Sequence, residues 1–172
     1  AVRVSNCTFE QSQHALWIKK NSNVNSGTNT FKYQQGTQII IQNNSVFKDN
    51  SSTILSGKGN GIFASKNCQL QLSNTIIKMH QLPQIWIQKN SRLTCNNCDI
   101  QNGEETALMV RDHSEASLKH CYVSNHIIAN IQVTVESRLH IENSQIVNSS
   151  GIGVQVKENS IANFNKCTFK NS

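Results

Sequence analysis

The residues with the most obvious capacity for chemistry are Cys95 and Cys98, in the stretch LTCNNCDI. A Cys-x-x-Cys pair can supply half of a zinc site or a redox-active dithiol. It can equally be two small side chains that fill a buried space. The chain contains six cysteines, an even number that does not choose between these roles.

Carboxylates and histidines form a second group of candidates. The chain carries ten Asp and Glu residues and six His residues. Glycoside hydrolysis needs two carboxylates about 5–10 Å apart, and a zinc site needs several ligands converging on one point. Whether any of these side chains meet depends on the elements that position them.

A repeat of 23 residues organises those elements. The segment KNSRLTCNNCDI aligns with KNCQLQLSNTII one unit earlier and with VESRLHIENSQI two units later. The period holds from residue 14 to the end, and one residue is missing from the first unit between Phe9 and Leu16. About seven and a half copies fill the chain, so we expect one domain over residues 1–172.

Within a unit the apolar residues alternate with polar ones, which predicts strands with one buried face. In the unit that begins at Ser91, the alternation slips by one residue between Cys95 and Cys98, and such a slip indicates a bend. Each unit therefore holds three short strands and three corners. The fold class is predicted as all-β, a single-stranded parallel β-helix in which each strand stacks on its equivalent one turn earlier.

Columns of like residues answer the question of the cysteines. Cys95 stands where neighbouring units have Leu72 and Leu118, and Cys98 stands where other units have Thr or Ser. Both are interpreted as buried fillers, with a disulfide between Cys98 and Cys121 and a metal site as the alternatives. One further inward column is made of serines: Ser22, Ser45, Ser91, Ser114, Ser137 and Ser160, with Cys68 in the third unit.

The segment LHIENSQIVNSSGIGVQVKENS resembles the repeats of the pectin-lyase-like superfamily, above all the module named for carbohydrate-binding proteins and sugar hydrolases. The resemblance covers the whole chain and implies a right-handed helix. It also implies a choice of activities, because the superfamily includes lyases, hydrolases and epimerases as well as non-catalytic modules of eukaryotic interaction proteins. A repeat of this kind specifies the coil and leaves the activity open.

The arrangement of acids and histidines argues against catalysis. Asp99 is expected to face outward between Ile76 and Tyr122 without a second carboxylate, and Glu104, Glu105 and Asp112 are expected in solvated corners. The histidines are interpreted as surface residues in six different columns: His14, His80, His113, His120, His126 and His140. We therefore predict a non-catalytic member of the superfamily, with no catalytic residue, no metal and no cofactor.

The outward position of the third strand is the most informative surface feature. It carries large apolar residues in five successive units and glutamine in the last two; the members are Trp17, Ile40, Phe63, Trp86 and Met109, then Gln132 and Gln155. Contiguous apolar surface usually marks an interface, and Trp is a frequent binding hot spot. Cations flank the column: Lys19, Lys20, Lys66, Lys89 and Arg111. A sugar-stacking platform, and a register error that would bury the column, are the alternatives.

Together these features predict a rigid scaffold that binds a protein partner, or another part of the same polypeptide, through the outward column. The basic rim and the net charge of +6 suit an acidic partner. A carbohydrate-binding or polysaccharide-processing module is the alternative function, whereas no nucleic-acid or membrane partner is expected. The six inward cysteines favour an intracellular location, cytoplasmic or associated with the cytoskeleton. The open ends of the helix favour a segment of a longer protein.

Overall fold

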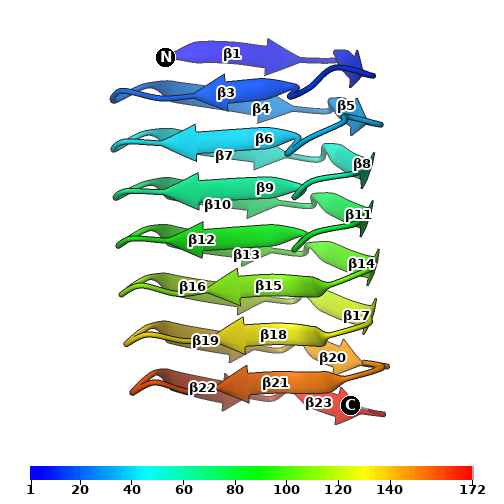
Figure 1. Ribbon diagram of the computed structural model, residues 1–172, viewed down its shortest axis with the longest axis vertical. Helices are drawn as coiled ribbons and strands as arrows, with labels where there is room; N and C mark the ends of the chain where they lie inside the picture. Colours follow the sequence, from blue (N-terminus) through cyan, green and yellow to red (C-terminus); the bar gives the residue numbers. More distant parts are fainter. Residues whose placement is uncertain (172) are drawn as a thin grey trace.

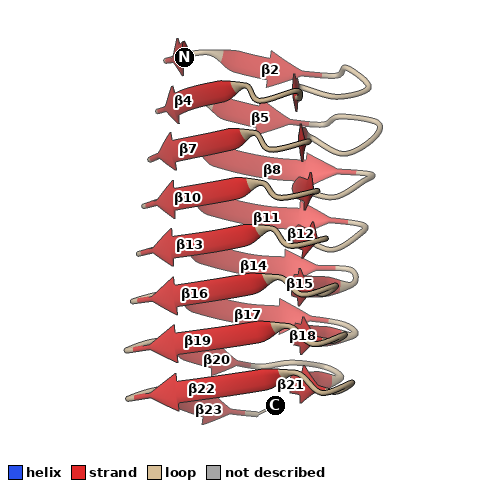
Figure 2. Ribbon diagram, turned by 90° about the vertical axis from the view of Figure 1, so that its left-hand side faces the viewer, coloured by secondary structure: helices blue, strands red, loops and turns tan. Residues whose placement is uncertain are grey.

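The computed structural model describes residues 1–171, which wind into a parallel β-solenoid (Figure 1). Ser172, the last residue of the predicted domain, lies outside the described residues. Three parallel sheets run along the solenoid, and each turn adds one strand to each of them (Figure 2). The predicted all-β parallel β-helix is confirmed. No helix that could cross a membrane occurs in residues 1–171.

The strands of the three sheets have the following bounds. Sheet A contains β1 (Val2–Ser5), β4 (Asn23–Gly27), β7 (Val46–Asn50), β10 (Gln69–Ser73), β13 (Arg92–Asn96), β16 (Glu115–Lys119), β19 (Arg138–Glu142) and β22 (Ile161–Asn165). Sheet B contains β2 (Thr8–Glu10), β5 (Thr30–Lys32), β8 (Thr53–Gly57), β11 (Ile76–His80), β14 (Asp99–Gly103), β17 (Tyr122–His126), β20 (Gln145–Val147) and β23 (Thr168–Lys170). Sheet C contains β3 (Leu16–Ile18), β6 (Ile39–Gln42), β9 (Ile62–Ser65), β12 (Ile85–Gln88), β15 (Thr106–Val110), β18 (Ala129–Val133) and β21 (Ile152–Val156).

The register of these sheets reproduces the sequence repeat. Thr8 pairs with Thr30, an offset of 22, whereas Leu16 pairs with Ile39, an offset of 23. The residue missing from the first unit therefore lies in the loop between β2 and β3. Because each strand pairs with its own equivalent, like residues stack in columns.

Left-handed backbone makes the corners. Between sheets C and A two successive residues have positive φ, for example Lys66 at 69° and Asn67 at 59°. Asn adopts this conformation readily because its short side chain hydrogen-bonds locally. Stacked amides also bond along the axis, since Asn67 Nδ2 donates to Asn44 Oδ1 at 3.1 Å. His113 and Glu136 adopt the same backbone in later turns, so the corner tolerates residues other than Asn.

The serine column satisfies backbone groups at the start of sheet A. Ser91 Oγ accepts a hydrogen bond from the Cys68 N–H at 3.2 Å and donates to the Gln88 carbonyl at 2.8 Å. The Ser91 N–H in turn donates to Ser114 Oγ at 3.1 Å. These hydroxyls are buried, so each replaces the water that a backbone amide at a bend would otherwise need.

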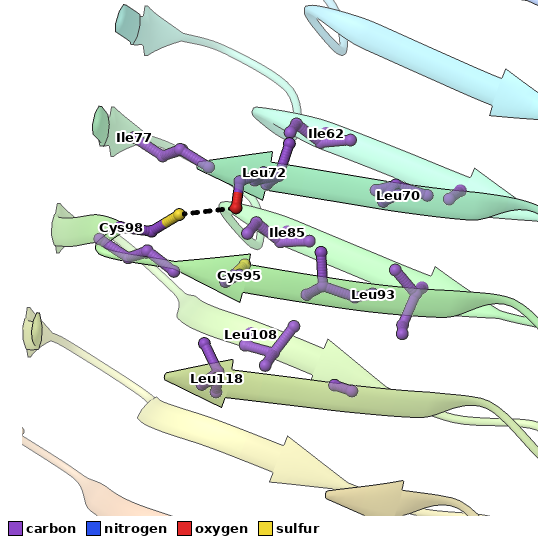
Figure 3. Close-up of a cluster of buried hydrophobic side chains, with 14 of the residues drawn as sticks. Ile62, Leu70, Leu72, Ile77, Ile85, Leu93, Cys95, Cys98, Leu108 and Leu118 are labelled. Atoms are coloured by element: carbon purple, nitrogen blue, oxygen red, sulfur yellow. Dashed lines mark hydrogen bonds between the residues drawn. The ribbon is translucent and has the colours of Figure 1, made fainter. Parts of the chain in front are cut away.

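The interior is aliphatic, and four of the six cysteines belong to it, whereas Cys7 is exposed and Cys167 is partly buried. Figure 3 shows Cys95 in the core among Leu72, Leu93 and Leu118, and Cys98 with its sulfur turned toward Leu72. Cys98 Sγ donates to the Leu72 carbonyl at 3.6 Å, and all six cysteines are free thiols. Burial raises the pKa of the Cys68 thiol, which opposes formation of a nucleophilic thiolate. The interpretation as buried fillers agrees with this packing.

The interpretation of all six histidines as surface residues is wrong for two of them. His80 and His126 are fully buried at the corner between sheets B and C. They are 46 residues apart, which is two repeat lengths, so they share one column, and the expectation of six different columns is wrong as well. His80 Nδ1 lies 3.0 Å from Gln84 Oε1, Gln84 Nε2 lies 2.7 Å from His126 Nε2, and His126 Nδ1 lies 3.0 Å from Asn130 Oδ1.

We call this buried chain of hydrogen-bonded side chains the polar corner; its members are His80, Gln84, His126 and Asn130. The polar corner has room only because the intervening turns carry small residues. Gly57 and Gly103 occupy the histidine column in the alternate turns. A Cβ built on Gly103 would lie 2.6 Å from His126 Cδ2, closer than nonbonded carbons approach. Large polar and small residues thus alternate, and the true repeat at this corner is two turns long.

Candidate functional site

The predicted outward column faces the solvent side of sheet C. Trp86 pairs with Phe63 on one side and with Met109 on the other, while its chain neighbours Ile85 and Ile87 are fully buried. The register error considered above is therefore wrong. We call the column the apolar stripe; its members in register are Trp17, Ile40, Phe63, Trp86 and Met109. At the usual strand spacing it extends about 19 Å along the solenoid.

The aromatic rings of the stripe present carbon surface, while one indole nitrogen is hydrogen-bonded within the chain and the other is buried. Trp17 is 56% exposed, and its indole Nε1 donates to Gln42 Oε1 at 3.1 Å. Lys19 Nζ lies 4.5 Å from the centre of the Trp17 ring, a cation–π contact. Phe63 and Trp86 meet edge to face, with 5.3 Å between ring centroids and planes at 79°. Trp86 Nε1 is buried.

Lysines line the edge of the stripe at the corner between sheets C and A. Lys20, Lys66 and Lys89 are exposed and share the first left-handed position of that corner. Successive turns of the corner are joined by backbone bonds, such as that from the Asn67 N–H to the Lys89 carbonyl at 2.9 Å. None of the three lysines forms an ion pair with a described residue. We call them the lysine edge.

The remaining predicted cations, Lys19 and Arg111, differ from the lysine edge. Lys19 is exposed, but its ammonium group is engaged with the face of the Trp17 ring. Arg111 Nε lies 3.4 Å from Asp112 Oδ1, so part of its charge is neutralised within the chain. The structure thus gathers all five predicted cations beside the stripe but leaves only Lys20, Lys66 and Lys89 without a partner inside residues 1–171.

The apolar stripe and the lysine edge end at about the same turn. In the stripe, Gln132 and Gln155 follow Met109. In the lysine column, Asn43 stands in the Ile40 turn, Asp112 follows Lys89 in the Met109 turn, and the column ends with Glu158. The lysine edge therefore lies beside three of the five turns of the stripe, and neither feature continues beyond Met109. This overlap defines one composite surface.

The four carboxylates singled out in the sequence lie on strand β14 and in the two corners that follow it. Asp99 stacks between Ile76 and Tyr122 as predicted, and its Oδ2 lies 2.8 Å from Lys78 Nζ. Glu104 and Glu105 lie in the corner between β14 and β15, and Asp112 in the next corner. Among these four, the structure shows no pair that faces one substrate from two sides.

One buried acid, Asp49, was not expected from the sequence. Its carboxylate accepts hydrogen bonds from Ser52 Oγ at 2.6 Å and from Thr75 Oγ1 at 2.8 Å. The signal was available, because Asp49 stands in the inward column where the next turns have Leu72 and Cys95. These hydrogen bonds satisfy the buried carboxyl oxygens, so the group holds the corner between sheets A and B together.

No grouping of three or more His, Cys, Asp or Glu side chains suited to a metal ion exists within the described part of the chain. His113 Nδ1 does approach Glu136 Oε2 at 3.5 Å, but both side chains are exposed on a corner. The candidate functional site considered below is therefore the surface formed by the apolar stripe and the lysine edge.

The stacked turns define the chain as a parallel β-helix repeat protein. Residues 37–172 match the family model described as the right handed beta helix region, and the chain belongs to this family. The right-handed helix expected from the repeats is thereby confirmed. A search of curated proteins found no match. Family membership specifies how the chain coils, and the function has to be argued from the surface.

Proposed function

We propose that the chain is a non-catalytic scaffold that binds a protein segment through the apolar stripe and the lysine edge. The segment belongs to another protein or to another part of the same polypeptide. The observation that carries the proposal is the overlap of the two features: the lysine edge lies beside Trp17, Phe63 and Trp86, and neither feature continues beyond Met109. The apolar side chains supply burial, and the lysines select a partner of negative charge.

The geometry of the rings favours a polypeptide over a glycan. A sugar chain stacks on ring faces that lie in one plane, whereas the planes of Phe63 and Trp86 are 79° apart. Sugar recognition also uses polar groups at the rim of the ring. The indole N–H of Trp17 is already bonded to Gln42, and that of Trp86 is buried. The stripe therefore offers contact area to apolar side chains but few hydrogen-bond partners to the hydroxyls of a sugar.

The thiols are consistent with a reducing compartment, and we place the scaffold inside the cell. Five of the six cysteines are buried or partly buried free thiols that substitute for Ser, Thr or Leu in their columns. A secreted repeat protein of this size has no need of such thiols and often uses disulfides instead. The proposed location rests on the thiols and is independent of the proposed binding surface.

A photo-crosslinking amino acid tests the surface in the organism's own full-length protein. We expect the crosslinker at position 63 or 86 to capture a polypeptide, and the same crosslinker at Thr94, on the outer face of sheet A, to capture none of it. A Trp86→Ala change should weaken that capture severalfold. Equal capture from position 94, or binding to an arrayed glycan that Trp86→Ala abolishes, would refute the proposal.

A further inference from the structure

We propose that the segment bound by the apolar stripe is an amphipathic α-helix with acidic residues along one flank. This inference rests on the proposed function and adds the shape and charge of the partner. It follows from three properties of the face: the direction and spacing of the stripe, the width of sheet C, and the one-sided position of the lysine edge.

The direction and spacing of the stripe match a helix better than an extended strand. The stripe runs across the strands, with one side chain per turn, at a spacing of about 4.8 Å. An extended strand laid along it presents same-side residues about 6.7 Å apart, which loses register within two turns of the solenoid. A helix presents a row of side chains with a pitch of about 5.4 Å. The four intervals from Trp17 to Met109 thus correspond to about 13 residues of helix.

The width of the face also suits a single helix. Strand β12 of sheet C is four residues long, so the face is about 13 Å across. A helix with its side chains is about 10–12 Å in diameter and would cover it. A second copy of the solenoid would meet only roughly 250 Å² of this face (about 13 by 19 Å), well below the ~800 Å² per partner of a stable pair.

Charge defines one flank of the helix. Some cations of the chain pair with an acid one turn away, as in Lys32–Glu10 at 3.1 Å and Lys119–Glu142 at 3.4 Å. Lys20, Lys66 and Lys89 have no acidic partner among the described residues, so the charge of this edge is open to a partner. The opposite edge of the stripe carries no Lys, Arg, Asp or Glu beside Trp17 to Trp86; it holds His14, Thr37, Asn60 and Pro83. The partner should therefore carry its acids on one side only.

A displayed library of random 16-residue peptides, selected on this chain, tests the inference without knowledge of the natural partner. We expect enriched peptides with apolar residues at helical spacing and Asp or Glu on one flank. Both tryptophans of the chain lie in the stripe, so their fluorescence reports binding of a synthetic copy directly. Circular dichroism of the bound peptide should show helix.

Matched variants separate this inference from the proposed function. Trp86→Ala should weaken the selected peptides about 30-fold, the usual effect of a hot spot. A Lys66→Glu/Lys89→Glu double variant should weaken them about tenfold, whereas Lys48→Glu on sheet A should not. Peptides that bind Trp86→Ala as well as the parent chain would overturn the proposed function. Peptides that need Trp86 but are extended, lack acids, or ignore the lysine reversal would overturn this inference alone.

Discussion

Acid should unfold this protein through His80 and His126 in particular. Gln84 Nε2 donates to the Gln101 carbonyl and faces His126 Nε2, so His126 Nε2 must be an acceptor without a proton. His126 Nδ1 then carries the proton that Asn130 Oδ1 accepts. By the same logic His80 Nδ1–H donates to Gln84 Oε1, and His80 Nε2 is left buried without a partner. Both rings are thus neutral in the folded chain.

A second proton on either ring has no acceptor. On His126 it would point at the amide hydrogens of Gln84, and on His80 it would be buried without a partner. Burial accordingly lowers the pKa of each histidine from 6.5 to about 4, an effect only partly offset by the bonds to Gln84 and Asn130. Between pH 4 and pH 6.5 the histidines of the unfolded chain bind protons that those of the folded chain do not. Stability is therefore complete above pH 6.5 and falls as the pH drops toward 4.

The size of the effect follows from the shift. One pKa unit corresponds to about 1.36 kcal/mol, so each histidine contributes about 3 kcal/mol of lost stability by pH 4. Two independent histidines would give a slope of about 2.7 kcal/mol per pH unit in the middle of the range. A domain is stable by only about 5–15 kcal/mol, so this loss is large enough to observe directly.

Urea unfolding, followed by circular dichroism from pH 4.5 to 8, measures the effect. Carboxylates titrate in part of this range, so the informative quantity is the difference from a His80→Gln/His126→Gln variant. Glutamine is the natural choice, because Gln34 occupies the same column two turns before His80. His140→Gln, at an exposed position of sheet A, is the control. If the double variant has the same pH slope as the parent chain, the bonding scheme of the polar corner is wrong.

Other predictions address the core and its thiols. Ile85→Ala should lower the free energy of unfolding by about 2–5 kcal/mol through a cavity, whereas Trp86→Ala should have a much smaller effect in urea unfolding; equal losses would mean that the stripe is core. Gly103→Ala should destabilise the chain because its Cβ would meet His126 Cδ2 at 2.6 Å, and His126→Ala should relieve the loss; additive effects would contradict this contact. A maleimide should label the exposed Cys7 in the folded protein and Cys98 only after unfolding, as mass spectrometry can show; rapid labelling of Cys98, or an intrachain disulfide, would refute the assignment of the cysteines.

The 23-residue repeat alone determined the architecture. Each residue of a parallel solenoid stacks on its equivalent, so a linear period in the sequence is also a neighbour relation in space. The stripe from Trp17 to Met109 and the buried positions of Cys95 and Cys98 followed from that period and the alternation of the strands. The place of the one-residue deletion before Leu16 was also evident, because equivalent residues are 22 positions apart before it and 23 apart after it.

The polar corner was decided by the tertiary structure. Periodicity says which residues share a column, but it does not say whether a corner position points inward, because left-handed residues break the alternation of faces. His80 and His126 could have been placed in one column from their 46-residue spacing, yet their burial depends on the bend after β11 and β17. Likewise, the unpaired state of Lys66 and Lys89 is a matter of side-chain distances. The sequence repeat thus determined which residues stack on one another along the axis. The local backbone of each bend determined whether a corner side chain points inward or outward.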